Sequence, residues 1–284
     1  MSTFIRKVSA PVRIDFAGGT TDIKPFTNTH GGAVLNCTID RYVYGTLTGT
    51  DHNTKLEYHA DIPTSSGLGT SSAMNVVWVA LTSKLTNKPE IARSVFHIEQ
   101  AVSTSRVNGK QDMYAATFGG INYMEFIGDE VKVHPLNLRK EFIKKFNDRL
   151  VLVYSGKGHL SGNSNKAMID NLLKGKNTKN LIRIKEIAGE MRTALIKEDL
   201  YEFAYLMNKE TEERRKLSKV TVSKQLQKII DDANKNGAIG SKICGSGGGG
   251  SVLLFAEDKN KLVKFFGKKV IPFKFDFDGL KWLK

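Results

Sequence analysis

Apolar residues recur with helical spacing in two segments of the first half of the chain. After Ser71 they occupy positions i, i+3, i+4, i+7 and i+8, at Ala73, Val76, Val77, Ala80 and Leu81. This spacing predicts a helix that begins directly after a glycine-rich turn. A second set, at Ile91, Val95, Ile98 and Val102, predicts another helix and places Glu99 on a neighbouring face.

Similar patterns predict helices in the second half, over residues 181–195, 200–207 and 226–233. The last pattern has Ser223 at its start and Gly237 just past its end, two residue types that typically cap helices. Towards the end of the sequence we expect a short helix around Leu262 and then a strand over residues 270–277.

Strands are predicted where β-branched and aromatic residues are dense. The segment INYMEFIGDEVKVH has two alternating runs around an Ile-Gly-Asp-Glu turn, which is typical of an antiparallel hairpin. Residues 149–156, RLVLVYSG, and the later SVLLFA predict apolar strands in the second half. We therefore expect an α+β protein with two domains, residues 1–150 and residues 151–284.

The composition excludes several classes of protein and kinds of site. With 284 residues, 40% hydrophobic and 25% charged, the chain is not of a disordered, collagen-like or coiled-coil class. Two cysteines, Cys37 and Cys244, are too few for a disulfide framework and lack metal-ligand spacing. The N-terminal segment has no apolar signal region and no apolar run is long enough to span a membrane, so we expect a cytoplasmic protein without a membrane contact.

The charge balance points to an anionic ligand. Lys and Arg number 43 against 29 Asp and Glu, a formal net charge of +14 that would attract phosphates of any kind. The basic residues are scattered along the chain and no nucleic-acid motif accompanies them, which disfavours nucleic acid as the partner. Phosphorylated small molecules need the same positive field.

The segment PTSSGLGTSSA, residues 63–73, carries the strongest chemical signal. Glycines and small hydroxyl residues lead into a helix N-terminus, where free backbone N–H groups favour a bound anion. It is not a Walker A loop, because no Gly-Lys-Ser/Thr closes it. The residues alone leave open a phosphate-binding loop or a helix that Ser71 or Ser72 merely caps.

A second glycine cluster lies in KICGSGGGGSVLLFA, at Gly245 and at residues 247–250. GGGGS resembles a flexible linker. A buried strand follows at once, however, and glycines beside a sheet usually permit close backbone approach. We expect this cluster to pack on the first glycine loop.

Three further residues are ambiguous when each is considered alone. VNGKQDMYAATFGG places Asp112 in a glycine-bounded loop, where it is either a turn or cap residue or a base that neighbouring Lys110 keeps ionised. APVRIDFAGGTTDI places Arg13 on a strand and Asp22 after a Gly-Gly turn. Their simplest interpretations are a surface strand residue and a turn residue.

In this order, the segments resemble the motifs of the GHMP kinase family, named for galactokinase, homoserine kinase, mevalonate kinase and phosphomevalonate kinase. The resemblance covers nearly the whole chain. It is nearest to the D-glycero-D-manno-heptose 7-phosphate kinase branch in FAGGTTDI, HGGAVLNCTID, NGKQDMYAATFGG and GSGGGG. It implies a GHMP kinase-like two-domain fold, with an N-terminal half like the second domain of ribosomal protein S5 and a ferredoxin-like C-terminal half.

The resemblance also implies residue roles. Asp112 would be the catalytic base, with Arg13 and Lys110 as neighbouring cations. Ser71 and Glu99 would bind Mg²⁺, and the substrate would contact Gly18, Gly19, Asp22 and Gly245. The ATP phosphates would lie against Ser65, Ser66, Gly67, Leu68, Gly69, Thr70, Ser71, Ser72 and Gly247.

The implied activity is ATP- and Mg²⁺-dependent phosphorylation of a hydroxyl, the anomeric one, of a sugar or sugar phosphate by a monomer or homodimer. Alternatives are a kinase of an unphosphorylated hexose or polyol, a catalytically silent sugar sensor, and an RNA-binding module suggested by the net charge. Lys157, His159 and Lys166 cluster at the start of a predicted helix. They form either a dock for a substrate phosphate or a solvated basic loop.

Overall fold

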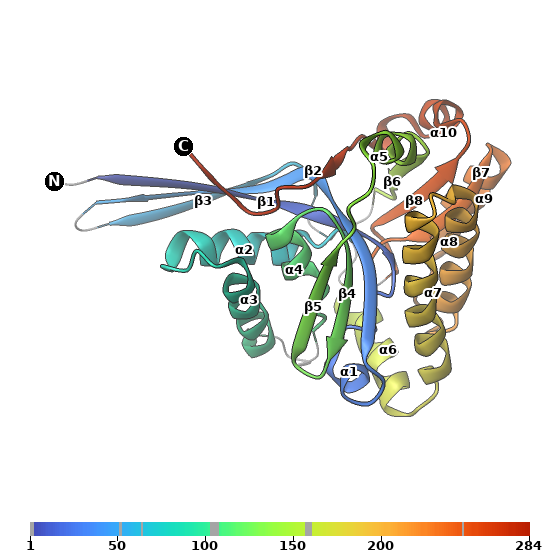
Figure 1. Cartoon of the computed structure of the whole chain (residues 1–284), viewed down its shortest axis with the longest axis horizontal. Coiled ribbons are helices and arrows are strands. Elements are labelled where there is room, and N and C mark those ends of the chain that lie inside the picture. Colours follow the sequence, from blue (N-terminus) through green and yellow to red (C-terminus); the bar gives the residue numbers. More distant parts are fainter. Residues whose placement is uncertain (1–2, 51–52, 64, 103–107, 157–160, 246) are drawn as a thin grey trace.

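The structure is a computed structural model that describes residues 3–50, 53–63, 65–102, 108–156, 161–245 and 247–284, with the backbone alone for residues 161–165. It is an α+β protein, as predicted, with two antiparallel sheets and helices packed around them (Figure 1). Among the described helices, none combines the length and apolar character needed to cross a membrane.

The first sheet has seven strands and receives both ends of the described chain. Its main order is β11 (Lys281–Leu283), β1 (Phe4–Ala17), β2 (Gly32–Gly49), β4 (Ile121–Ile127) and β5 (Glu130–Pro135), while β3 (Thr54–Ala60) and β10 (Phe275–Asp276) also pair with β2. The predicted hairpin is confirmed as β4 and β5, which pair antiparallel.

The second sheet has the order β7 (Ala238–Ile243), β8 (Ser251–Ala256), β6 (Leu150–Tyr154) and β9 (Val270–Ile271). Alternate residues of β8 enter different cores. Leu253 and Phe255 join the larger core, which also contains first-sheet residues, whereas Val252 and Leu254 face the smaller core. The strand alternation thus ties this sheet to the first one on one side.

The helices fall into groups around the sheets (Figure 1). On one side of the first sheet lie α2 (Thr70–Thr82), α3 (Lys88–Val102) and α4 (Gln111–Phe118), and α5 (Lys140–Asn147) precedes β6. The long helices α7 (Thr178–Ile196) and α8 (Leu200–Arg215) contribute to the core shared by the sheets. In the smaller core, α9 (Lys224–Lys235) and α10 (Lys259–Phe266) cover the second sheet, and the short η1 (Gly267–Lys269) follows α10. A third cluster joins α1 (Lys24–His30), α6 (Ser161–Leu173) and α7.

The helix patterns of the sequence are confirmed, including the capped helix α9. Its Ser223 side chain accepts a hydrogen bond from the N–H of Leu226, and Gly237 follows with a φ of 95°. The single strand expected over residues 270–277 is wrong, because Pro272 separates two short strands in different sheets. The division at residue 150 stays a prediction, and β10 and β11 return to the first sheet across it.

Candidate active site

A cavity of about 450 Å³ lies where the two halves of the chain meet. Most residues singled out in the sequence line it: Arg13, Gly19, Asp22, Ser65, Ser66, Gly67, Gly69, Thr70, Ser71, Ser72, Glu99, Asp112, Gly245 and Gly247. They come from β1, the loops after β1 and before α2, helices α2, α3 and α4, and the glycine loop between β7 and β8. Segments far apart in the sequence therefore converge on a single cavity.

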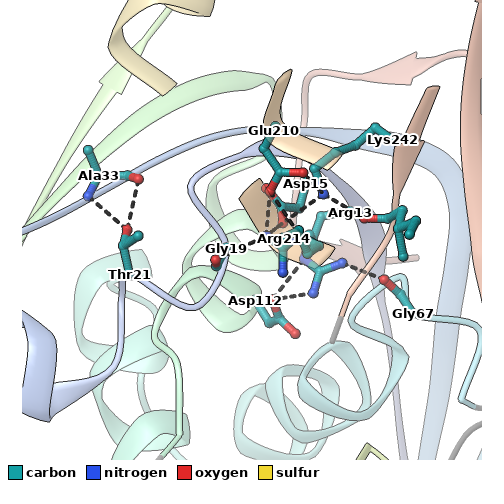
Figure 2. A network of polar contacts seen from close by, with 11 residues as sticks. Arg13, Asp15, Gly19, Thr21, Ala33, Gly67, Asp112, Glu210, Arg214 and Lys242 are labelled. Atoms are coloured by element: carbon teal, nitrogen blue, oxygen red, sulfur yellow. Dashed lines mark hydrogen bonds and ion pairs between the residues drawn. The ribbon is translucent and has the colours of Figure 1, made fainter. Parts of the chain in front are cut away.

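Arg13 and Asp112 form an ion pair on the wall of this cavity (Figure 2). Both Nε and Nη2 of Arg13 lie 2.7 Å from Oδ1 of Asp112, and Nη1 donates to the carbonyl oxygen of Gly67 at 2.8 Å. Burial alone would lower the pKa of Arg13, but the carboxylates of Asp112 and Asp15 raise it. The surface interpretation of Arg13 is thus wrong, because only 5% of the residue is exposed.

Asp112 lies in the first turn of α4, not in the loop that the flanking glycines suggested. The helix begins at Gln111, whose backbone N–H donates to Oδ2 of Asp22 at 2.9 Å. Asp22 lies in a turn, as its simplest interpretation predicts, and its carboxylate is also an acceptor for a helix start 89 residues away. Burial raises the pKa of Asp22 to about 6, although the bond from Gln111 opposes the shift.

The side chain of Lys110 points away from Asp112, so the prediction that Lys110 lies beside the catalytic base is wrong. Its Nζ donates to the carbonyl oxygen of Gly128 at 2.7 Å and lies 5.1 Å from the ring centroid of Phe96. It is absent from the cavity lining of the described residues. Residues two apart at a helix start point in different directions, so the nearness of Lys110 and Asp112 in the sequence did not imply contact between their side chains.

The loop before α2 is shaped for backbone contacts. Gly67 and Gly69 have φ values of 79° and 74°, which glycine adopts without strain. Gly69 is the N-cap and no side chain caps the helix, so the interpretation of Ser71 or Ser72 as a side-chain cap is wrong. The first residues of α2, whose N–H groups have no acceptor within a helix, border the cavity together with the exposed Ser71, as a phosphate-binding loop requires.

The second glycine loop packs directly on the first, as predicted. A Cβ on Gly67 would lie 2.6 Å from the carbonyl oxygen of Cys244, and one on Gly250 would lie 2.8 Å from that of Ser66. A Cβ on Gly245 would lie 2.9 Å from the Cα of Gly67. Side chains at these positions would collide with backbone, which explains the glycines and excludes a linker.

Ser71 and Glu99 both border the cavity and supply hard oxygen donors. Glu99 accepts a hydrogen bond from Nδ2 of Asn75 at 3.0 Å, and burial raises the pKa of Glu99. No cluster of three or more His, Cys, Asp or Glu that could hold a metal occurs within the described ranges. The pair fits Mg²⁺, which is often bound by one or two protein oxygens together with substrate phosphates.

A buried charge cluster that reaches the cavity wall through Asp15 and Arg214 was not predicted from the sequence. It comprises Asp15 of β1, Glu210 and Arg214 of α8, and Lys242 of β7, with side chains at most 1% exposed (Figure 2). Two spacings in the sequence could have indicated this cluster. Asp15 is two residues from Arg13 and so shares its face of β1, and Glu210 is four residues before Arg214.

A few predicted residues lie elsewhere. Gly18 and Leu68 do not line the cavity among the described residues; Leu68 is buried in the core and its carbonyl accepts from the N–H of Arg13. Lys166 is exposed on α6, outside the cavity lining. Lys157 and His159 lie outside the described residues, so the predicted phosphate dock remains a prediction.

Two family models match the chain. The model described as GHMP kinases N terminal domain matches residues 34–120, and that described as GHMP kinases C terminal matches residues 191–268. The chain belongs to the GHMP kinase family. This GHMP kinase contains the cavity between the two matched regions, and the family uses ATP as its phosphoryl donor.

Three of the proteins similar to this chain are sugar kinases or contain a sugar kinase. The D-glycero-alpha-D-manno-heptose 7-phosphate kinase of Campylobacter jejuni is 28% identical, over 97% of this chain and 98% of that protein. The bifunctional fucokinase/GDP-fucose pyrophosphorylase of Arabidopsis thaliana is 24% identical, over 97% of this chain and 32% of that protein. A crystal structure of a D-glycero-D-manno-heptose 1-phosphate kinase from Bacteriodes thetaiotaomicron superposes with a TM-score of 0.77 and 25% identity, over 99% of both chains. This GHMP kinase therefore resembles sugar kinases along its whole length.

Proposed function

We propose that this GHMP kinase transfers the γ-phosphoryl group of ATP to the anomeric hydroxyl of a sugar phosphate, as a heptose 7-phosphate kinase does. The similarity to the Campylobacter jejuni enzyme, over nearly all of both chains, supports this acceptor class. The similarity to the D-glycero-D-manno-heptose 1-phosphate kinase from Bacteriodes thetaiotaomicron supports a heptose phosphate as the class of substrate.

The observation that carries the proposal is the position of Arg13. One guanidinium contacts both the carboxylate of Asp112 and the carbonyl of Gly67 in the phosphate loop, at 2.7 and 2.8 Å. The base and the ATP phosphates would then meet at one cation. Charge that develops on the transferring group would be stabilised by a side chain that the protein already holds in place.

Asp112 is oriented for proton transfer. Arg13 contacts its Oδ1, whereas Oδ2 lies towards the phosphate loop, where a Cβ on Gly69 would be 3.2 Å away. In the proposed reaction the acceptor hydroxyl gives its proton to Asp112. The hydroxyl oxygen forms a bond to the γ-phosphorus, the bond to the β,γ-bridging oxygen breaks, and ADP leaves.

Other residues hold the reactants. Backbone N–H groups of residues 65–72 would bind the triphosphate at the start of α2, and Asp22 would accept hydrogen bonds from sugar hydroxyls. Ser71 and Glu99 would hold Mg²⁺, which neutralises phosphate charge when it is bound. Met168 and Ile169 of α6 supply an apolar part of the cavity wall.

The test is a phosphorylation assay with defined acceptors. The protein is incubated with Mg-ATP and D-glycero-D-manno-heptose 7-phosphate, the free heptose, fucose or galactose, and products are identified by ³¹P NMR. We expect a new anomeric phosphoester on the heptose 7-phosphate. Absence of any new phosphoester with all four acceptors contradicts the proposal.

One observation favours a second candidate, a kinase of an unphosphorylated sugar. The described cations that line the cavity are Arg13 and Arg214, and each is already paired with a carboxylate. A phosphate group on the acceptor, in addition to those of ATP, would need a further cation. Lys166 is one candidate, and Lys157 and His159, which are close to it in the sequence, are two others. Faster phosphorylation of fucose or the free heptose than of the heptose 7-phosphate would support this candidate.

A further inference from the structure

The loop between β1 and α1, residues 18–22, contains a residue in a costly conformation. Thr20 has a φ of 79°, in the left-handed region that a residue with a branched Cβ rarely adopts. Thr20 and Asp22 both line the cavity. The N–H of Thr21 donates to the carbonyl oxygen of Gly18 at 3.0 Å, so Thr20 is the third residue of a turn, where a positive φ is normally taken by glycine. Contacts around the loop must help to hold a threonine in this conformation.

Both ends of the loop are fixed within the first half of the chain. Oγ1 of Thr21 donates to the carbonyl oxygen of Ala33 at 3.0 Å and accepts from its N–H at 3.1 Å. Asp22 accepts the N–H of Gln111. Before Thr21, a Cβ on Gly18 would lie only 2.0 Å from the carbonyl oxygen of Ala33, so this end is in close contact with β2.

The middle of the loop is held from the second half. Nη2 of Arg214, on α8, donates to the carbonyl oxygen of Gly19 at 3.0 Å (Figure 2). Gly19 directly precedes Thr20, and its carbonyl belongs to the peptide unit that defines φ of Thr20. A hydrogen bond to this oxygen therefore restrains the strained rotation itself.

Arg214 is fixed by a charge-balanced cluster. Its Nε and Nη2 donate to Oε1 of Glu210 at 2.8 and 2.6 Å, and Nη2 lies 3.7 Å from Oδ2 of Asp15. Nζ of Lys242 lies 3.6 Å from the same oxygen of Asp15 and 3.3 Å from Oε2 of Glu210. Lys242 and two carboxylates thus surround the guanidinium, whose Nη1 is buried without a hydrogen-bond partner among the described residues.

The loop rests directly on this cluster. A Cβ on Gly19 would lie 2.1 Å from Oδ2 of Asp15 and 3.3 Å from Nη2 of Arg214. The absence of a side chain at Gly19 therefore permits the contact between the loop and Arg214.

We propose that Arg214 is a positioning residue for acceptor binding. It holds the Gly19 carbonyl, keeps Thr20 in the left-handed conformation, and thereby fixes the loop from which Asp22 faces the cavity. The proposal rests on the proposed function, which assigns this loop to the acceptor. Through Arg214, helix α8 of the second half contributes to acceptor binding by the first half.

The first test replaces the planar guanidinium by an ammonium. Arg214→Lys keeps the charge but loses the fork that contacts Gly19 and Glu210 together. We expect the KM for D-glycero-D-manno-heptose 7-phosphate to rise about tenfold, the scale of one lost hydrogen bond, with kcat and the KM for ATP within about twofold of wild type. Arg215→Lys, at the exposed next position, is the matched control and should change none of these values. Equal increases in both KM values overturn the proposal.

The second test asks whether the conformation of Thr20 is the link. Thr20→Gly removes the cost of a positive φ, so in that background Arg214→Lys should raise the acceptor KM by less than about threefold. If Arg214→Lys raises the acceptor KM equally with threonine and with glycine at position 20, the proposal is overturned. If Arg214→Lys does not fold, the double variant Arg214→Met/Glu210→Met keeps Asp15 paired with Lys242 and is measured in the same way. An inactive wild-type protein would contradict the proposed function, whereas a wild-type-like acceptor KM in a folded Arg214 variant contradicts only the positioning role.

Discussion

The carboxylate of Asp22 accepts a hydrogen bond from the N–H of Gln111, the residue directly before Asp112. The side chain predicted to bind sugar hydroxyls thus also fixes the start of the helix that carries the predicted base. Acceptor binding and base orientation share one buried carboxylate, and burial raises the pKa of this carboxylate to about 6.

The first prediction concerns stability against pH. The pKa of Asp22 is about 6 in the folded chain against an ordinary value of 3.8, so the folded state binds this proton more tightly. The contribution of Asp22 is therefore fully present below the unfolded pKa and lost as pH rises through about 6. Between pH 7 and pH 4, we expect wild type to gain about 2 kcal/mol relative to Asp22→Asn. Urea unfolding of both proteins across this range measures the difference, and parallel pH profiles contradict the prediction.

The second prediction tests the base. Asp112→Asn keeps the side-chain shape but cannot take the proton, so kcat should fall at least about 10²-fold while the KM for ATP stays near that of wild type. Steady-state kinetics with Mg-ATP and the active acceptor measure both constants. Asp148→Asn, whose side chain is 56% exposed in a surface ion pair, is the control and should be fully active. A folded Asp112→Asn protein with wild-type kcat would remove Asp112 from the mechanism.

The third prediction tests the metal site. Glu99→Gln removes an anionic oxygen from the cavity, so the Mg²⁺ concentration for half-maximal rate should rise, on the order of tenfold. Ser71→Ala should act in the same direction but less strongly. Glu90→Gln, an exposed position on the same helix α3, is the control. Superimposable Mg²⁺ curves for Glu99→Gln and wild type would leave Glu99 without a metal role.

The fourth prediction separates Lys110 from the chemistry. Its ammonium contacts Gly128 and the ring of Phe96 rather than Asp112, so Lys110→Met should lower the free energy of unfolding by about 1 to 3 kcal/mol. The kcat should remain within about threefold of wild type. Denaturant unfolding and kinetics on the same preparation check both parts. A loss of kcat comparable with that of Asp112→Asn would restore Lys110 to the active site.

Long elements with clear periodicity could be predicted from the sequence. The helices α2, α7 and α9 have apolar faces long enough to show a helical period, and the glycine loops indicated close backbone approach. Helix α4 could not be predicted in this way, because eight residues give barely two turns and the acceptor for its first N–H is Asp22, from a distant segment.

Contacts between residues far apart in the sequence limited how much of the site could be predicted. The family resemblance brought Arg13, Asp112 and the phosphate loop together, and the structure shows Arg13 in contact with both. The contact of Arg214 with Gly19 joins residues 195 positions apart, and no local pattern in the sequence indicates it. Lys110 shows the opposite error, since a residue two positions from the base faces away from it.

The return of residues 275–283 to the first sheet has a consequence for protein synthesis. The N–H of Leu280 donates to the carbonyl oxygen of Thr117, and Asp276 accepts from the hydroxyl of Tyr42, so this segment closes over the end of α4 and the middle of β2. These residues leave the ribosome after every other element of the two sheets. The phosphate loop can reach its final packing once residues 244–250 have been made, whereas the helix that carries Asp112 gains its final contacts only when translation of residues 275–283 is finished.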